Sequence, residues 1–350
     1  SFFSIDPACA SICRRDFTHN LSQLAHCFAQ GKIGSGFDVS SAIYGSHNYR
    51  RFNPDVLAHA ISTSATSLDI ELDDEGKQIR KTMSWCLCDP TSLLQSLGTT
   101  VQEGALDGGD NYHHCTTTMT VSTEEIIVSV QVAKKGSQLY THIAWDNVVK
   151  PFSLPPRLKL LLADIRGGSN TPSMVRKVLD WRKREEKDAL RVWTELDIAN
   201  EKVAEGFRKL NEYSKTSKEN FLEELKEWVQ LQKSKVSVED EEDKKVVYST
   251  LSIIQAEFQK IRALLKYMGE KSDVPIEPPS QTRLIDATMT VPGVILSGVP
   301  GAGGFDSIFA ICVDEEGVTV GVEAVWQQWN EITVLPVAVT DDREGLREEE

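Results

Sequence analysis

Three glycine-bearing stretches contain residue types that could hold an anionic group. In the first, residues 31–38 read Gly-Lys-Ile-Gly-Ser-Gly-Phe-Asp. Glycines permit positive φ and let main-chain N–H groups approach a ligand, and a helix that starts here adds the positive end of its dipole. We expect Asp38 in the first turn of that helix, where a carboxylate could equally serve as a helix cap.

The second stretch is Gly-Gly-Ser-Asn-Thr-Pro at residues 167–172. It follows an apolar run and precedes a helical pattern, so Ser169, Thr171 and main-chain donors could bind an anion. A Ser or Thr before Pro is also an ordinary helix N-cap, and that alternative stays open.

The third stretch, residues 298–306, reads Gly-Val-Pro-Gly-Ala-Gly-Gly-Phe-Asp. Four glycines within seven residues indicate an unusual backbone path. Neither a Walker A loop nor a GxGxxG fingerprint is present, which removes the commonest nucleotide-binding motifs. A tight turn without a ligand is the competing interpretation.

Helices and strands must position these stretches. Apolar spacing predicts helices at 21–30, 37–44, 173–184, 187–210, 218–232, 240–268 and 323–329. Alternating or β-branched runs predict strands at 67–72, 125–132, 158–165, 294–297, 308–313, 318–322 and 332–339. Strands, then helices, then strands indicate an α+β protein. The helical block lacks a sustained heptad, so we prefer packed helices to a coiled coil.

Composition limits the classes of function. The chain has 350 residues and a net charge of −14, concentrated at 239–243 and 341–350, which we expect to be solvated. An acidic chain disfavours nonspecific nucleic-acid binding. No apolar run approaches the ~20 residues of a membrane helix, so we expect a cytoplasmic protein without a membrane partner.

The seven cysteines follow no disulfide framework. A metal site formed by Cys86 and Cys88 with residues 113–115 (His-His-Cys) is conceivable, but the spacing matches no standard zinc pattern. We therefore expect ordinary thiols. Residues 1–15 form neither a signal peptide nor a clear structural element, which suggests a truncation or a misread gene start.

Taken together and in order, these stretches resemble the phosphomevalonate kinases. Residues 34–46 (Gly-Ser-Gly-Phe-Asp-Val-Ser-Ser-Ala-Ile-Tyr-Gly-Ser) and 49–52 (Tyr-Arg-Arg-Phe) are similar to the stretch that bears the family's catalytic aspartate. Residues 167–174, 275–282 and 298–309 are similar to its later motifs. The resemblance covers residues 21–336.

This resemblance implies a GHMP kinase fold with two lobes. We expect an incomplete S5-like N-terminal lobe at 1–155 and a ferredoxin-like C-terminal lobe at 156–340 that includes the helical block 173–268. An acidic tail would follow at 341–350. The implied reaction uses ATP and Mg²⁺ to phosphorylate phosphomevalonate, an isoprenoid precursor, as a small-molecule substrate.

The resemblance also implies residue roles. Asp38 would be the catalytic carboxylate, which positions the acceptor and contacts Mg²⁺ or a lysine, with Lys32 offsetting phosphate charge. The residues that would bind the substrate are Gly34, Ser35, Gly36, Ser169 and Thr171. The phosphate loop would consist of Gly301, Ala302, Gly303, Gly304 and Asp306.

One family feature has no counterpart. The Gly-Leu-Gly-Ser-Ser-Ala loop that cradles ATP is absent from residues 1–20. Each preorganised donor of this kind is commonly worth ~3 kcal/mol in a transition state, so we expect the chain as written to be a weak or inactive kinase. The alternatives are another GHMP kinase, acting on mevalonate or homoserine, an inactive GHMP-fold protein, or a helical scaffold.

Overall fold

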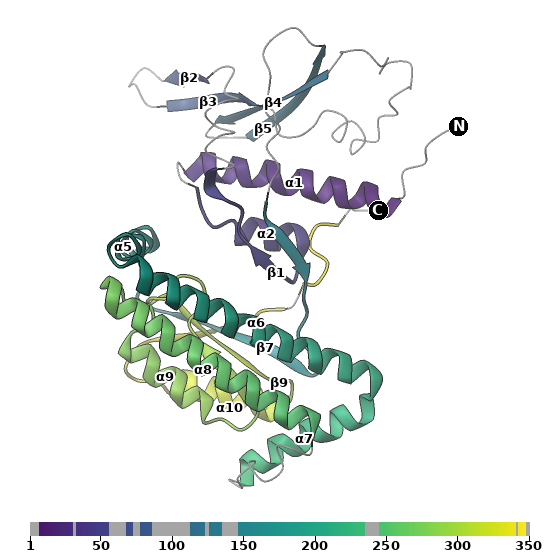
Figure 1. Cartoon of the computed structure of the whole chain (residues 1–350), viewed down its shortest axis with the longest axis vertical. Helices are drawn as coiled ribbons and strands as arrows, with labels where there is room; N and C mark the ends of the chain where they lie inside the picture. Colours follow the sequence, from purple (N-terminus) through teal and green to yellow (C-terminus); the bar gives the residue numbers. More distant parts are fainter. Residues whose placement is uncertain are drawn as a thin grey trace. The chain divides into compact units, whose positions relative to one another are not determined.

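In the computed structural model the chain folds into two units (Figure 1). Unit 1 comprises Ser1–Ser153 with Asp342–Glu350, and unit 2 comprises Leu154–Asp341. The structure describes residues 7–30, 33–55, 68–72, 78–85, 113–122, 126–134, 146–234, 245–340 and 342–347. None of the helices in these ranges combines the length and apolarity that crossing a membrane requires.

The described part of unit 1 contains two helices that pack together, α1 (Pro7–Gln30) and α2 (Phe37–Tyr44). Leu24 and Cys27 of α1 and Ile43 of α2 are buried. The sequence predicted α2 with these bounds, but α1 begins at Pro7 instead of at residue 21. The first half of α1 mixes small, basic and polar residues, and it therefore lacks the apolar stripe on which the prediction depended.

Among the residues of unit 1 that the structure describes, six strands form two antiparallel sheets. Strand β1 (His47–Arg50) pairs with β6 (Val148–Pro151). Strands β2 (Leu68–Leu72), β3 (Gln78–Trp85), β4 (His113–Ser122) and β5 (Ile126–Lys134) follow one another in a meander. The strands expected at 67–72 and 125–132 correspond to β2 and β5.

The C-terminal segment lies against the end of α2. The Leu346 amide donates to the Ile43 carbonyl at 3.1 Å. Gly345 has a φ of +67°, and a Cβ there would lie 2.4 Å from the Gly45 nitrogen, so two glycines allow the two backbones to touch. Residues 342–347 are mostly exposed, as expected for a solvated tail, but they also contact the end of α2.

Unit 2 is built on a four-stranded antiparallel sheet with the order β10-β7-β9-β8. Its strands are β7 (Leu158–Ile165), β8 (Val294–Gly298), β9 (Ser307–Val313) and β10 (Val334–Val337). Helices separate β7 from β8 and β9 from β10. This β-α-β-β-α-β order is the ferredoxin-like arrangement, which confirms the α+β class. The apolar run at 158–165 is a central strand, as predicted.

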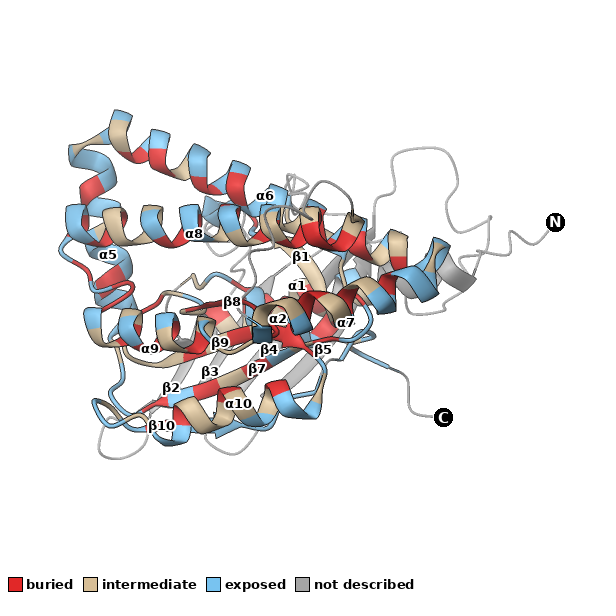
Figure 2. Ribbon diagram, turned by 90° about the horizontal axis from the view of Figure 1, so that it is seen from below, coloured by how far each residue is buried: buried red, intermediate tan, exposed pale blue. Residues whose placement is uncertain are grey.

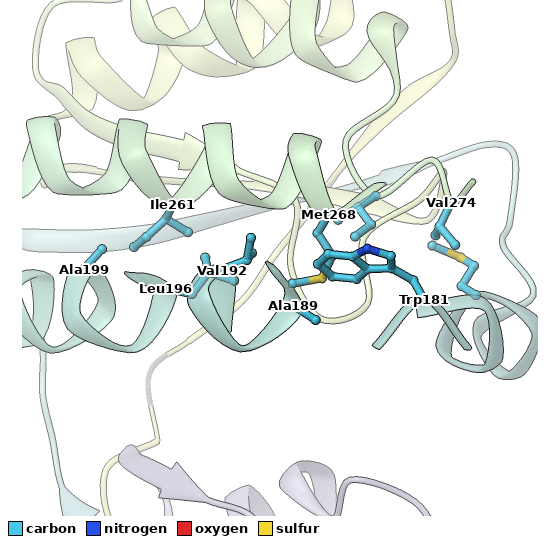
Figure 3. Packing of buried hydrophobic residues seen from close by; sticks show 10 residues of the cluster. Trp181, Ala189, Val192, Leu196, Ala199, Ile261, Met268 and Val274 are labelled. Carbon is cyan, nitrogen blue, oxygen red and sulfur yellow. The ribbon is translucent and has the colours of Figure 1, made fainter. Parts of the chain in front are cut away.

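Four long helices lie between β7 and β8: α5 (Thr171–Arg184), α6 (Glu186–Thr216), α7 (Lys218–Ser234) and α8 (Val246–Ser272). The apolar faces of α5, α6 and α8 meet around the fully buried Trp181 (Figure 3). Val192 and Leu196 of α6 face Ile261 and Met268 of α8 in this cluster. Burying one such side chain contributes about 1.5–3 kcal/mol, so this shared core stabilises the helices against one another. The helices are therefore packed in one globular unit, as expected.

Two further helices correct the predicted pattern. Residues 318–322 were expected to be a strand, but they lie within α10 (Glu316–Gln327). Val318, Val322 and Trp326 are buried at a spacing of four residues, which is the period of one helix face. Figure 2 shows that α10 carries both buried and exposed residues. Helix α9 (Pro279–Met289) was not predicted, although a proline near its start is a known helix-start signal.

Candidate functional site

In unit 1, the first glycine stretch starts helix α2. Gly36 is the N-cap residue with φ 80°, and no side chain caps the helix. Asp38 lies in the first turn, as predicted, but Gly36 and not Asp38 is the N-cap residue. Asp38 Oδ2 instead lies 3.3 Å from Nε2 of His26 in α1, and half of the Asp38 side chain is exposed. The carboxylate is thus accessible at the positive end of a helix.

Side chains distant in sequence hold the backbone of residues 33–36. The Tyr49 hydroxyl donates to the Ser35 carbonyl at 3.2 Å, and Arg51 donates to the Ile33 carbonyl at 3.1 Å. Burial raises the pKa of Tyr49 above its ordinary 10, so the hydroxyl keeps the proton that it donates. The ends of the loop are therefore fixed by the segment that follows α2.

Gly36 is required by close packing. A Cβ at this position would lie 2.5 Å from Oε1 of Gln23, which is fully buried in α1. At Gly34, by contrast, a Cβ would meet nothing within 4 Å, and Ser35 is exposed. A side chain at position 34 would therefore have no close neighbour, whereas one at position 36 would not fit. Lys32, the predicted catalytic cation, lies outside the described residues.

In unit 2, the second and third glycine stretches lie together. The Ser169 amide donates to Oδ1 of Asp306 at 2.7 Å, although the two residues are 137 positions apart. The Phe305 amide donates in return to Oγ of Ser169, also at 2.7 Å. A third bond joins the Gly168 amide to the Phe305 carbonyl at 3.3 Å. Asp306 and Ser169 therefore lock the two loops to each other.

The contact between these loops is close enough to require glycine. A Cβ at Gly304 would lie 2.1 Å from Oγ of Ser169, and one at Gly303 would lie 2.2 Å from the carbonyl oxygen of Ile276. Gly301, Gly303 and Gly304 all have positive φ, of +65°, +74° and +93°. At Gly301 a Cβ would meet nothing within 4 Å. The loop is thus packed on one side and open at Gly301.

Some main-chain N–H groups of the third stretch donate to protein atoms, and others do not. The Gly303 amide donates to the Pro300 carbonyl at 3.2 Å, and the Gly304 amide donates to the Ile276 carbonyl at 2.8 Å. Within the described part of the chain, the amides of Gly301 and Ala302 have no acceptor. A phosphate group could therefore use two of the four amides that the sequence singled out.

The second stretch caps its helix with a residue that the sequence analysis did not single out. Asn170 is the N-cap of α5, and its side chain accepts from the Ser173 amide at 3.0 Å. The N-cap alternative for Ser169 and Thr171 is therefore wrong, and Thr171 is the exposed first residue of α5. Arg166, exposed just before this loop, is a cation that the sequence analysis also passed over.

The structure gives limited support for a preformed metal site. Among the described residues there is no group of three or more His, Cys, Asp or Glu side chains placed to hold an ion. Cys86 and Cys88 of the conceivable zinc site lie outside the described residues, while Cys27 and Cys312 are buried and form no disulfide. A Mg²⁺ ion usually needs one or two carboxylates plus substrate phosphates, and the exposed Asp38 fits that requirement.

Comparisons with known proteins give the chain its relationships. Residues 253–330 match the family described as GHMP kinases C terminal, a range that includes α9, α10 and the third glycine stretch. The chain is 33% identical over 336 residues to "Phosphomevalonate kinase, peroxisomal" of Arabidopsis thaliana, covering 95% of this chain and 52% of that protein. It is 31% identical over 317 residues to "Phosphomevalonate kinase erg8" of Aspergillus fumigatus, covering 90% and 47%.

A third relative, "Phosphomevalonate kinase" of Candida albicans, is 28% identical over 302 residues, with 86% of this chain and 50% of that protein covered. The chain thus spans about half the length of these curated relatives. The solved structure of a Lin0012 protein from Listeria innocua aligns with 13% identity and a TM-score of 0.49, over 92% of this chain and 59% of that one. The chain is thus similar to phosphomevalonate kinases over most of its own length, and its residues 253–330 match the GHMP kinase C-terminal family.

Proposed function

We propose that this chain provides the acceptor side and the late glycine loop of a phosphomevalonate kinase. In this reaction the γ-phosphoryl group of ATP moves to the phosphate of phosphomevalonate, which gives diphosphomevalonate and ADP. The observation that carries the proposal is the junction of the two glycine stretches of unit 2 through Ser169 and Asp306. Four relatives that bear the phosphomevalonate kinase name support it.

The chemistry asks for positioning more than for a strong base. The nucleophile is already an ionised phosphate oxygen, so the protein must align it and offset the charge of the transferring group. Asp38 stands half exposed at an uncapped helix start, where it can orient a Mg²⁺ ion or a bound cation. When bound, Mg²⁺ would neutralise phosphate charge, and the N–H groups of the first turn of α2 would face an anion.

In unit 2 the open side of the third stretch would receive phosphate oxygens. Gly301 and Ala302 offer main-chain N–H groups that no described residue accepts. Gly303, Gly304 and Phe305 donate to protein atoms instead, and they therefore hold the loop in shape. Preorganised donors of this kind stabilise developing charge without reorganising during the reaction.

An acceptor panel tests the assignment. ADP release by the 350-residue chain is measured with Mg·ATP and phosphomevalonate, mevalonate or homoserine as acceptor. The proposal predicts a higher kcat/KM with phosphomevalonate than with either of the others. Equal rates with all three, or a preference for mevalonate or homoserine, would refute it. The cytoplasmic location and the absence of nucleic-acid and membrane partners stay predictions.

A further inference from the structure

A buried ion pair lies beside the peptide on which the third glycine stretch rests. Arg262 of α8 binds Glu277, in the connection between α8 and α9, through two bonds: Nε to Oε2 at 3.1 Å and a terminal nitrogen to Oε1 at 2.7 Å. The two side chains are 5% and 0% exposed. Buried ion pairs are often no more stabilising than apolar residues of the same size, so stability alone does not explain this one.

The Glu277 carboxylate is surrounded by donors. Lys266 lies 3.1 Å from its Oε1, and the Thr282 hydroxyl donates to the same atom at 3.0 Å. Arg262 also binds Asp286 of α9 at 2.8 Å, so two cations balance two carboxylates. Burial acts to raise the pKa of Glu277, but Arg262 and Lys266 outweigh it and hold the pKa below its ordinary value. The carboxylate therefore stays ionised and ties residue 277 to both helices.

The peptide bond links this cluster to the glycine loop. The carbonyl of Ile276 shares one planar peptide unit with the nitrogen and Cα of Glu277, so the side chain that fixes Glu277 also orients that carbonyl. The Ile276 carbonyl accepts the Gly304 amide at 2.8 Å, and it lies where a Cβ of Gly303 would be. Ile276 is itself buried and packs in the helical cluster around Trp181.

We propose that Arg262 and Glu277 are positioning residues for the glycine loop 298–306. Through the Ile276 carbonyl they set the path of the loop at Gly303 and Gly304, and they thereby fix the direction of the uncommitted amides of Gly301 and Ala302. The effect on ligand binding rests on the proposed function, whereas the effect on loop geometry does not. Neither side chain needs to touch the substrate.

Amide hydrogen exchange, measured by NMR on the full chain, tests the geometric step. In Glu277→Gln the amide of similar shape replaces the carboxylate and leaves Arg262 without its main partner. We expect exchange at Gly304 to accelerate by about tenfold or more relative to the amides of β9, because a buried charge-assisted contact is lost. The matched control is Glu257→Gln on α8, the helix that carries Arg262, since the Glu257 side chain is only 10% exposed and binds Lys202 and Lys260.

A second variant covers the case in which Glu277→Gln does not fold. Arg262→Lys keeps the charge but loses the two-point geometry, and we expect a smaller acceleration at Gly304 in the same direction. An unchanged ratio between Gly304 and β9 in the folded variant would overturn the proposal. The same increase in Glu257→Gln would also overturn it, because the effect would then be general to the unit.

Ligand titration separates this inference from the function on which it rests. Phosphomevalonate and Mg·ATP are added in separate titrations while the amide signals of Gly301 and Ala302 are followed. We expect a shift in the wild-type chain and an affinity about tenfold weaker in Arg262→Lys, unchanged in Glu257→Gln. No shift in the wild-type chain, together with the predicted exchange result, would refute the loop's binding role but not its positioning. A shift whose affinity is the same in all variants would refute the positioning.

Discussion

Alanine substitutions at three glycines of one loop should destabilise unit 2 by graded amounts. Gly301→Ala places a side chain at φ +65° with nothing within 4 Å, so it carries backbone strain alone, about 1–2 kcal/mol. Gly304→Ala adds a Cβ 2.1 Å from Oγ of Ser169. Overpacking typically costs about 1–3 kcal/mol, and moving that oxygen also breaks its bond with the Phe305 amide, worth about 1 kcal/mol.

The predicted loss for Gly304→Ala is therefore about 3–6 kcal/mol, about three times that for Gly301→Ala. Gly303→Ala should cost at least as much as Gly304→Ala, because its Cβ meets the backbone carbonyl of Ile276, which cannot rotate away. Urea unfolding followed by tryptophan fluorescence measures these losses, since five of the seven tryptophans lie in unit 2. Equal losses at Gly301 and Gly304 would refute the packing on which the site depends.

Three other perturbations test separate contacts. Ser169→Ala removes the acceptor of the Phe305 amide and should cost about 1–2 kcal/mol in urea unfolding, whereas Ser173→Ala, an exposed serine in α5, should cost little. Because the pKa of Glu277 is lowered in the folded chain, its stabilisation is present above its ordinary value of 4.5 and is lost as pH falls through the lowered value. The difference in unfolding free energy between wild type and Glu277→Gln should therefore shrink on acidification below that value; a difference that grows would contradict this sign. Gly345→Ala should release the C-terminal segment from Gly45 and speed its proteolysis in the folded chain, and an unchanged cleavage rate would count against the docking.

Much of the fold follows from local patterns in the sequence. Strand β7 and helix α2 were predicted with the bounds that the structure has, because each is a run of mostly apolar or small residues next to a glycine-bearing turn. The strand expected at 318–322 was wrong because its valines are β-branched and such residues favour strands. The buried positions of α10 recur every four residues, as in a helix. The four-residue spacing of its apolar side chains was the signal in the sequence that indicated a helix.

The site was predictable in its parts but not in its connections. The three glycine stretches were visible, and so was the place of Asp38 in the first turn of a helix. Local sequence could not show that Ser169 meets Asp306, since the two residues are joined only by the sheet order that sets β7 beside β9. Local sequence also gave no sign of the roles of His26 and Arg262, because their partners Asp38 and Glu277 lie 12 and 15 residues further along the chain.

The most direct test of the central claim compares phosphomevalonate-dependent ADP release by Asp38→Asn with the weak release that we expect of the wild-type chain. The matched control is Asp55→Asn, since Asp55 is an exposed aspartate of the same unit that lies outside the first glycine stretch. If Asp38 orients the reacting phosphates, kcat/KM should fall about 10²-fold in Asp38→Asn and stay near the wild-type value in Asp55→Asn. The same rate in Asp38→Asn as in Asp55→Asn would contradict the claim that the glycine-bounded start of α2 carries the chemistry.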